Sequence, residues 1–351
     1  MTLPLFEQFP GVAALPVAGI AALPTPLQPV VLEGVSDAVG QCAVKRDDAT
    51  NRLYGGNKVR KLDFLLGSAR AEGRRSVVTF GAYGSNHALA TAVHARALGL
   101  EPHVVMSPQP PTAYARATLL AHARLGTRLH LVDGWDGMRD AARVRRQLAQ
   151  RDGIEPLVIP MGGTDELGAI GYVNAAFEVG SEFDVVYVAS GTLGTAVGLA
   201  VGFAALGAMT RTVAVRVTPA GIANLTVARV LADKTIALLR SRDATFPRLD
   251  AEELRLELRD EFFEPGYAVP TPQAARAVAL ARRSGVVLET TYTGKALHAL
   301  WTDARAGALH DKRVLFWDTY HAGPMPPAGP VSALPRRLRT YVAECERLYP
   351  E

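Results

Sequence analysis

The sequence predicts an α/β protein with mostly parallel β-sheet flanked by layers of helices. Short β-branched runs such as Val77–Phe80 and Val185–Ala189 alternate with longer segments whose apolar residues recur every three or four positions. Glycines such as Gly99, Gly126 and Gly153 closely follow the helical segments, so the links are short. This alternation requires neighbouring strands to run parallel. A chain of 351 residues is long enough for two ordinary domains or one large one.

The first part of the chain is expected to contain an arm and one series of strands and helices. Residues 1–40 are rich in Pro, Ala and Val, and we expect an arm packed on the body of the protein. Within it, the prolines of Leu23–Leu27 disfavour helix in the residues before them, so that stretch is expected to be extended or turning. A short strand around Cys42–Asp48 and the turn Gly55–Gly56 follow. The later elements are expected in this order: a helix from Lys58 to near Gly73, strand Val77–Phe80, helix Ala88–Leu98, strand His103–Met106, helix Ala113–Leu125, strand Arg128–Val132, helix Met138–Gln150 and strand Leu157–Ile159.

A second series follows the glycines at 162 and 163. The expected elements are helix Ala169–Val179, strand Val185–Ala189, a helix through Leu206, strand Thr212–Val217, helix Ile222–Leu239, helix Pro272–Arg283, strand Val286–Leu288, helix Lys295–Ala306, strand Val314–Trp317 and helix Leu338–Leu348. The charged segment Asp243–Glu264 has no clear period and is left unassigned.

Composition excludes several classes of function. The net charge of +4 comes from arginines spread along the chain, which argues against a nucleic-acid surface. Cys42 and Cys345 have no partner spacing and indicate free thiols in a reducing compartment. No apolar run reaches the roughly 18 residues that cross a bilayer, so we expect a cytoplasmic protein without membrane contact. The spacing of His87 and His94 does not suit a metal site, and we expect no metal.

Lys58 is the most informative single residue. It follows Gly55, Gly56 and Asn57 and begins a helix, where the positive end of the helix dipole disfavours a second positive charge. This environment favours the neutral amine, which attacks carbonyl groups. The alternative is a glycine turn followed by a solvated surface lysine, and the local sequence leaves both interpretations open.

Three loops that follow strands carry further polar residues. In parallel sheets, ligands bind at the carboxyl ends of strands. The loop Ser190–Thr195 offers two glycines and three hydroxyl groups at a helix start, which suits a phosphate group or a simple helix cap. Ser85–His87 begins another helix, where Ser85 or Asn86 is a capping residue. Tyr292 lies in a third loop and is either an acid, a stacking group or a buried aromatic residue.

Taken together, these stretches resemble the pyridoxal-phosphate-dependent D-cysteine desulfhydrase and 1-aminocyclopropane-1-carboxylate deaminase family, of fold-type II and similar to the tryptophan synthase β chain. The motifs occur in the family's order over residues 20–325: Gly55-Gly56-Asn57-Lys58-x-Arg60-Lys61-Leu62, Ser85-Asn86-His87, Pro160-x-Gly162-Gly163, Gly168-x-x-Gly171-Tyr172-Val173, Ser190-Gly191-Thr192-x-Gly194-Thr195 and Tyr292-Thr293-Gly294-Lys295-Ala296.

The resemblance implies roles for individual residues. Lys58 would hold pyridoxal 5′-phosphate as a Schiff base, and Asn86 would bond its 3′-oxygen. Ser85 would lie near the substrate carboxylate and Tyr267 and Tyr292 would be the two active-site tyrosines. The remaining implied contacts are Ser190, Gly191, Thr192, Leu193, Gly194 and Thr195 around the phosphate, Thr293 and Thr319 at the pyridine nitrogen, and His87, with Ser85 and Asn86, at the substrate.

The residue after Tyr292 separates the two activities of the family. Cyclopropane deaminases have Glu there, which keeps the pyridine nitrogen protonated, whereas this chain has Thr293, as the desulfhydrases do. A neutral partner suits β-elimination better than opening of a cyclopropane ring. The resemblance therefore implies a lyase acting on a D-amino acid such as D-cysteine and releasing pyruvate, ammonia and sulfide. Alternatives are cyclopropane deamination, elimination from a substrate such as cysteate, or a pyridoxal-phosphate or amino-acid-binding protein without turnover.

The resemblance also implies an organisation, and the chain departs from the family in two places. We expect a large cofactor-binding domain of residues 1–52 and 166–351, a small domain of residues 53–165, and a homodimer. The family's usual Gln before Ser85 is Gly84 here. Its usual His-Thr-Gly-Gly after the last strand is Asp318-Thr319-Tyr320-His321, in which only Thr319 is retained.

Overall fold

The computed structural model describes residues 2–133 and 137–350, with the side chains of 137 and 138 left aside, and it forms two compact units. The first unit comprises residues 2–15, 21–64 and 164–322, and the second comprises 16–20, 65–163 and the chain from 323 onward. These contact-based units group 53–64 with the first unit and 323–350 with the second, unlike the expected division into 1–52 plus 166–351 and 53–165. The division into a large and a small domain stays a prediction.

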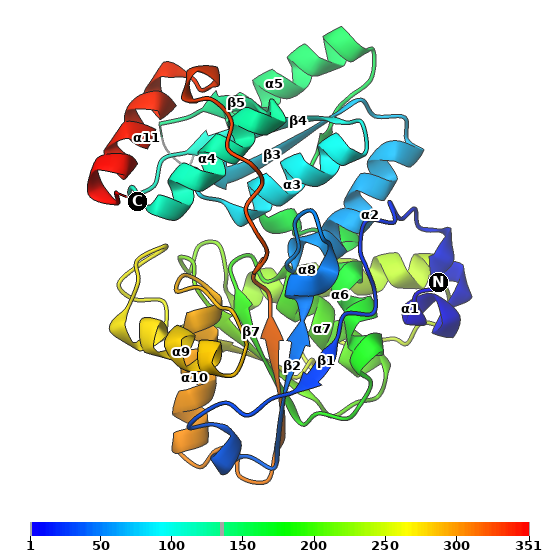
Figure 1. The fold of residues 1–351 in the computed structure, drawn as a ribbon. Coiled ribbons are helices and arrows are strands. Elements are labelled where there is room, and N and C mark those ends of the chain that lie inside the picture. Colours follow the sequence, from blue (N-terminus) through cyan, green and yellow to red (C-terminus); the bar gives the residue numbers. More distant parts are fainter. Residues whose placement is uncertain (1, 134–136, 351) are drawn as a thin grey trace. The chain divides into compact units, whose positions relative to one another are not determined.

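The first unit contains a six-stranded sheet (Figure 1). Its strands, in spatial order, are β1 (Leu27–Pro29), β2 (Gln41–Arg46), β10 (Arg313–Asp318), β7 (Val185–Ser190), β8 (Arg211–Arg216) and β9 (Leu256–Arg259). Every neighbouring pair is parallel except β1 with β2. The carboxyl ends of five strands therefore lie at one edge of the sheet.

Helices cover both faces of this sheet, because alternate residues of each strand point to opposite sides. Val186 and Val188 of β7 belong to a core with the helices α6 (Glu166–Val179), α7 (Gly194–Ala205) and α8 (Leu225–Arg242), together with the short α1 (Pro4–Gln8). Val185 and Tyr187 belong to a second core with α9 (Pro272–Arg283) and α10 (Thr293–Arg305). The predicted layered arrangement of this unit is confirmed.

The second unit contains a smaller parallel sheet. Its order is β5 (Arg128–Leu131), β4 (Glu101–Ser107), β3 (Ser76–Ala82) and β6 (Leu157–Val158). One core contains residues of α3 (Asn86–Ala97), α4 (Ala113–Leu125) and the terminal α11 (Arg336–Leu348), and another contains residues of α5 (Gly137–Asp152). The helix α2 (Lys58–Ala71) contributes residues to both units. The 3-10 turns are Pro10–Ala14, Ser36–Ala38, Asp47–Thr50, Met161–Gly163 and Val331–Ala333.

The arm begins with the short helix α1, since a proline is tolerated at the first helical position and Leu5 and Phe6 are buried. The unassigned segment 243–264 contains β9. One sequence-based expectation is wrong. Val286–Leu288 is not a strand: its first and last residues are buried while Val287 is 42% exposed, so the alternating pattern records burial against helices without a ladder partner.

Within the described residues, no helix is long and apolar enough to cross a membrane. Cys42 and Cys345 are free thiols, as expected, and both are buried.

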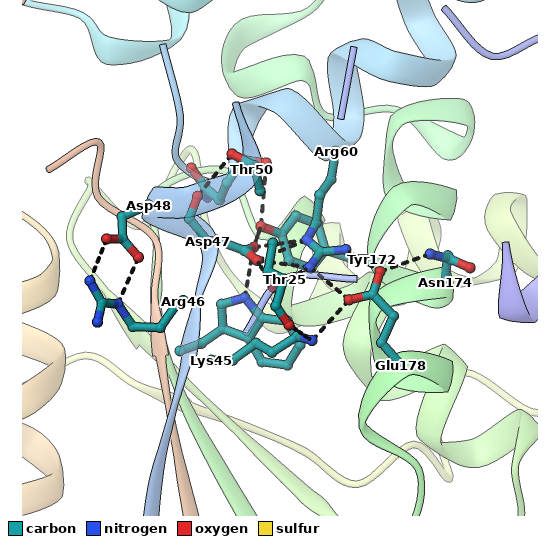
Figure 2. Close-up of polar contacts among 12 residues, drawn as sticks. Thr25, Lys45, Arg46, Asp47, Asp48, Thr50, Arg60, Tyr172, Asn174 and Glu178 are labelled. Atoms are coloured by element: carbon teal, nitrogen blue, oxygen red, sulfur yellow. Dashed lines mark hydrogen bonds and ion pairs between the residues drawn. The ribbon is translucent and has the colours of Figure 1, made fainter. Parts of the chain in front are cut away.

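A buried polar network ties the start of α2 to the first unit (Figure 2). The Arg60 guanidinium donates to both oxygens of Asp47, at 2.9 and 3.0 Å from Nε, and to both oxygens of Glu178, at 2.7 and 2.9 Å. Lys45 Nζ lies 2.9 Å from Glu178, so two cations face two carboxylates. Tyr172 and Trp317 also donate to Asp47, at 2.6 and 2.8 Å. We call these residues the Arg60 network.

The charges of the Arg60 network are balanced, as are its hydrogen bonds. Burial alone would raise the pKa of Asp47, but the charge of Arg60 and the hydrogen bonds from Arg60, Tyr172 and Trp317 hold that pKa below its ordinary value. Buried ion pairs stabilise only when every partner is satisfied, and losing one partner leaves a costly buried charge.

Removing the guanidinium should therefore destabilise the fold strongly. We expect Arg60→Met to lower the free energy of unfolding by about 3–5 kcal/mol, because the variant buries Asp47 without a cation. Arg46→Met is the control, since that arginine pairs with the half-buried Asp48 at a partly exposed site and should cost no more than about 1 kcal/mol. Urea unfolding measures both, and equal losses in the two variants would contradict this account.

Candidate active site

The turn before Lys58 is held by backbone contacts that leave no room for side chains. Gly56 has φ +91°, and its N–H donates to the carbonyl of Asp47 at 2.8 Å. A Cβ at Gly55 would lie 2.1 Å from the carbonyl oxygen of Asp48. The N–H of Asn57 donates to the carbonyl of Thr319 at 3.1 Å. Two glycines are therefore required for the turn to approach the carboxyl edge of β2 and β10.

Lys58 is the first residue of α2 and is half-buried. Its Nζ donates to Asn57 Oδ1 at 2.8 Å, and Asn57 Nδ2 donates to Thr195 Oγ1 at 3.1 Å. One amide thus joins the lysine to the loop that was predicted to bind phosphate. Burial lowers the pKa of Lys58 to about 8, against the opposing charge of Glu289. A lowered pKa of this size gives a substantial population of nucleophilic amine near neutral pH.

The loop Ser190–Thr195 follows β7 and begins α7. Leu193 adopts a left-handed conformation with φ 66°, which turns the chain sharply into the helix. The buried Ser190 Oγ has no hydrogen-bond partner among the described residues. A Cβ at Gly194 would meet Thr164 Oγ1 at 2.7 Å and Lys61 Nζ at 2.9 Å. The loop therefore presents an unpaired hydroxyl and a helix N-terminus beside a cation, an arrangement that suits a phosphate group.

Lys61 is a site residue to which the sequence reasoning gave no role. It is buried, and its Nζ donates to Thr164 Oγ1 at 3.2 Å; Thr164 Oγ1 in turn lies 2.7 Å from Thr192 Oγ1. Burial and the charge of Lys58 lower the pKa of Lys61 well below its ordinary value, opposed by Asp165. A bound dianion would favour the charged amine, so these groups fit a phosphate. The three-residue spacing from Lys58, which puts both lysines on one helix face, is the signal that could have found it.

The two predicted tyrosines meet. Tyr267 Oη lies 2.9 Å from Tyr292 Oη, and a Cβ at Gly191 would lie 3.3 Å from the ring of Tyr292. Burial raises the pKa of both phenols, and the negative charge of Glu289 contributes in each case. The pair therefore supplies protonated phenols at neutral pH next to the loop Ser190–Thr195.

Thr293 and Thr319 lie in the same unit but differ in their contacts. Thr293 is fully buried at the start of α10, and its Oγ1 accepts the N–H of Glu289 at 3.0 Å and lies 3.2 Å from Glu289 Oε1. Thr319 is buried directly after β10 and holds Asn57 through its carbonyl. The predicted contacts of both with a pyridine nitrogen stay predictions.

The segment that departs from the family pattern is packed against the lysine turn. His321 Nδ1 accepts the N–H of Gly55 at 2.9 Å, and its ring lies 4.0 Å from the ring of Tyr54 between centroids. Asp318 is fully buried and its Oδ1 accepts the N–H of Tyr320 at 3.1 Å. Burial and the charge of Asp48 raise the pKa of Asp318 well above its usual value of 3.8.

Ser85, Asn86 and His87 belong to the second unit. Ser85 caps α3 by accepting the N–H of Ala88 at 3.2 Å, and Asn86 Oδ1 accepts a hydrogen bond from the Tyr114 hydroxyl. His87 is buried, with Nε2 2.8 Å from Thr79 Oγ1. The cap explains part of this motif, and the predicted contacts of the three residues with cofactor and substrate stay predictions.

Comparison with known proteins identifies the class. The family described as pyridoxal-phosphate dependent enzyme matches residues 20–319. The chain belongs to this family, which confirms the predicted family, fold class and cofactor.

Individual relatives narrow the comparison. A D-cysteine desulfhydrase of Klebsiella pneumoniae (strain 342) is 36% identical over 295 residues, 79% of this chain and 85% of the relative. A solved structure described as an ACC deaminase homologue matches with a TM-score of 0.79 at 28% identity, covering 99% of this chain and 100% of the other. Threonine deaminase isoform 2 from Solanum lycopersicum, in its processed form, shares the fold, with a TM-score of 0.60 at 19% identity over 98% and 89% of the two chains.

Lys61 should contribute directly to cofactor affinity. We expect Lys61→Met to weaken pyridoxal-phosphate binding at least tenfold, roughly the value of one partly buried charge-assisted contact. Titration of the apoprotein by visible absorbance measures this affinity. Lys312→Met removes an exposed lysine from the same unit and should leave the affinity unchanged; unchanged affinity in the Lys61 variant would exclude that residue from the phosphate site.

Asp318→Asn should stabilise the protein at neutral and alkaline pH. A carboxyl whose pKa is raised by folding contributes stability that is complete below its unfolded pKa and is lost as the pH rises. The amide keeps the acceptor for Tyr320 but does not titrate, and each tenfold difference in proton affinity is worth about 1.4 kcal/mol. Urea unfolding at pH 4 and pH 8 tests this, with the exposed Asp233→Asn as control. A variant that is less stable than the unmodified protein at pH 8 would show that Asp318 is ionised.

Proposed function

We propose that this protein is a lyase that eliminates the β-substituent of a D-amino acid such as D-cysteine, giving pyruvate, ammonia and sulfide. The observation that carries the proposal is the connected set Lys58, Asn57 and Thr195, which joins a lysine of lowered pKa to a phosphate-binding loop. The similarity to a D-cysteine desulfhydrase supports the choice of reaction.

The residues of the first unit fit pyridoxal phosphate. Lys58 would hold the cofactor, while the loop Ser190–Thr195 and Lys61 would bind its phosphate. Once joined to the substrate amino group, the cofactor withdraws electrons from the α-carbon and so weakens the α C–H bond. A pKa of about 8 leaves roughly one tenth of the Lys58 amine neutral at pH 7, enough to accept that proton.

The remaining proton transfers follow from the tyrosine pair. As the α-proton moves to Lys58, the C–S bond breaks and sulfur leaves with its electron pair. Tyr267 and Tyr292 stay protonated near neutral pH and can donate a proton to the departing sulfur. The released 2-aminoacrylate then takes up water and yields pyruvate and ammonia, so atoms balance without an oxidant or reductant.

A neutral partner at the pyridine nitrogen favours this reaction over ring opening. We assign that role to Thr293 and Thr319, because neither side chain carries charge and both are buried, Thr293 at the start of α10 and Thr319 directly after β10. Deamination of 1-aminocyclopropane-1-carboxylate is the second candidate, supported by the similarity to an ACC deaminase homologue.

The proposal also covers residues of the second unit, the oligomeric state and the location of the protein. From the family resemblance, Ser85, Asn86 and His87 bind substrate and cofactor, and the enzyme is a cytoplasmic homodimer. The two free thiols are consistent with a reducing compartment.

Substrate comparison tests the function. Purified holoenzyme should release pyruvate and sulfide from D-cysteine, and pyruvate from 3-chloro-D-alanine, at least a hundredfold faster than it releases 2-oxobutyrate from 1-aminocyclopropane-1-carboxylate. The reason is that a Cβ leaving group relieves the charge at the α-carbon without a protonated ring nitrogen. L-cysteine is the control for chirality. Faster formation of 2-oxobutyrate would favour the second candidate, and binding of amino acids without products would favour a protein without turnover.

A further inference from the structure

Glu289 occupies the start of α10 in an unusual way. Its Oε1 accepts the N–H groups of Tyr292 and Thr293 at 2.8 and 2.9 Å, and its Oε2 accepts that of Thr291 at 2.7 Å. Its own carbonyl accepts the N–H of Gly294 at 2.7 Å. The N–H groups of the N-cap residue Tyr292 and of Thr293, which the helix start leaves unpaired, thus converge with that of Thr291, just before the helix, on one carboxylate. These are charge-assisted hydrogen bonds.

The residues held by this carboxylate are those of the candidate active site. Tyr292 meets Tyr267 through its hydroxyl and packs on Gly191, and Thr293 places its hydroxyl 3.2 Å from the carboxylate. The orientation of the Tyr292 backbone therefore depends on where the carboxylate lies. No role for Glu289 follows from the family resemblance as given above.

The charge of Glu289 also reaches the titrating groups of the site. Burial lowers the pKa of Lys58, and the carboxylate opposes that effect. Burial and the same carboxylate raise the pKa of Tyr320 to about 12, as they raise those of Tyr267 and Tyr292. Lys295, whose Nζ donates to the carbonyl of Phe263 at 2.7 Å, also interacts with Glu289.

We propose that Glu289 is a positioning residue of this active site: its carboxylate, bonded to the N–H groups of Thr291, Tyr292 and Thr293, fixes the turn that brings the Tyr292 hydroxyl to Tyr267. This inference rests on Lys58 being the reacting amine of the proposed function. The charge of Glu289, which opposes the lowering of the Lys58 pKa, supplies a second readout. The two effects are separable, because the turn depends on the reach of the carboxylate and the amine depends on its charge.

Two variants separate charge from reach. Glu289→Gln keeps an amide oxygen for Tyr292 and Thr293 but removes the charge, and Glu289→Asp keeps the charge but is shorter by one methylene. The control is Glu264→Gln, which removes an exposed carboxylate that also interacts with Lys295. Lys58 is titrated in the apoprotein by following the rate at which it reacts with pyridoxal phosphate, trapped by borohydride, as a function of pH.

In Glu289→Gln we expect the Lys58 titration midpoint to fall by about one pH unit, the size expected from losing one nearby opposite charge. The midpoint should stay within about 0.3 pH units in Glu289→Asp, while kcat for D-cysteine falls at least tenfold because the Tyr292 turn shifts. The Glu264 variant should change neither quantity. An unchanged midpoint in the Gln variant, or an unchanged kcat in the Asp variant, overturns the corresponding half of the proposal.

If Glu289→Gln does not fold, the Glu289→Asp variant decides the case. A shift of the Lys58 titration midpoint by about one pH unit in that variant, together with the fall in kcat, would overturn the separation of charge from reach. The apoprotein titration needs no substrate, so it distinguishes failure of this inference from failure of the proposed reaction. If D-cysteine is not consumed but the midpoint still shifts, the role of Glu289 stands and the substrate assignment falls.

Discussion

The pairing of Arg60 with both Asp47 and Glu178 is the interaction on which the site depends. Arg60 lies two residues beyond Lys58, so the guanidinium that joins α2 to α6 and to the turn Asp47–Thr50 after β2 also fixes the first turn of the lysine's helix (Figure 2). A planar guanidinium can satisfy two carboxylates at once in a fixed geometry, which a lysine cannot do. The Arg60 network fixes the position of Lys58 through the turn of the helix that carries it. Other groups determine the pKa of the Lys58 amine.

Several opposing effects, rather than one strong contact, set the pKa of the Lys58 amine. Lys58 and Lys61 lie on one face of α2. Burial acts against charge on both amines, and the charge of Lys58 also acts against charge on Lys61. Asn57 gives Lys58 a neutral acceptor, and Glu289 contributes a carboxylate that limits how far its pKa falls. A bound phosphate would offset the cost of charge at Lys61, so this pair of lysines is compatible with a phosphate in the loop.

Local sequence patterns predict features that adjacent residues determine, but they do not predict contacts between residues far apart in the chain. The glycine turn, Lys58 and Ser190–Thr195 are recognisable because turn, helix start and ligand are encoded in a few adjacent positions. The pairing of Arg60 with Glu178 joins residues 118 positions apart, and no local pattern specifies it. Val286–Leu288 shows the opposite failure, since an alternating pattern is satisfied by burial alone when helices cover it and no strand lies beside it. The Glu289 contacts lie between these cases, because a carboxylate just before a helix is a common signal that gains its meaning only from Tyr292 and Lys58.

The departure at Asp318–His321 changes the electrostatics less than its composition indicates. His321 Nδ1 accepts the N–H of Gly55, so the imidazole ring holds the glycine turn before Lys58 in one conformation. Burial and the charge of Asp48 raise the pKa of Asp318, and burial and the charge of Glu289 raise that of Tyr320 to about 12. Two of the three new side chains are thus shifted toward their protonated, uncharged forms at the strand end that carries Thr319. At the site proposed for the pyridine nitrogen, this shift disfavours an ionised partner, in line with the proposed elimination.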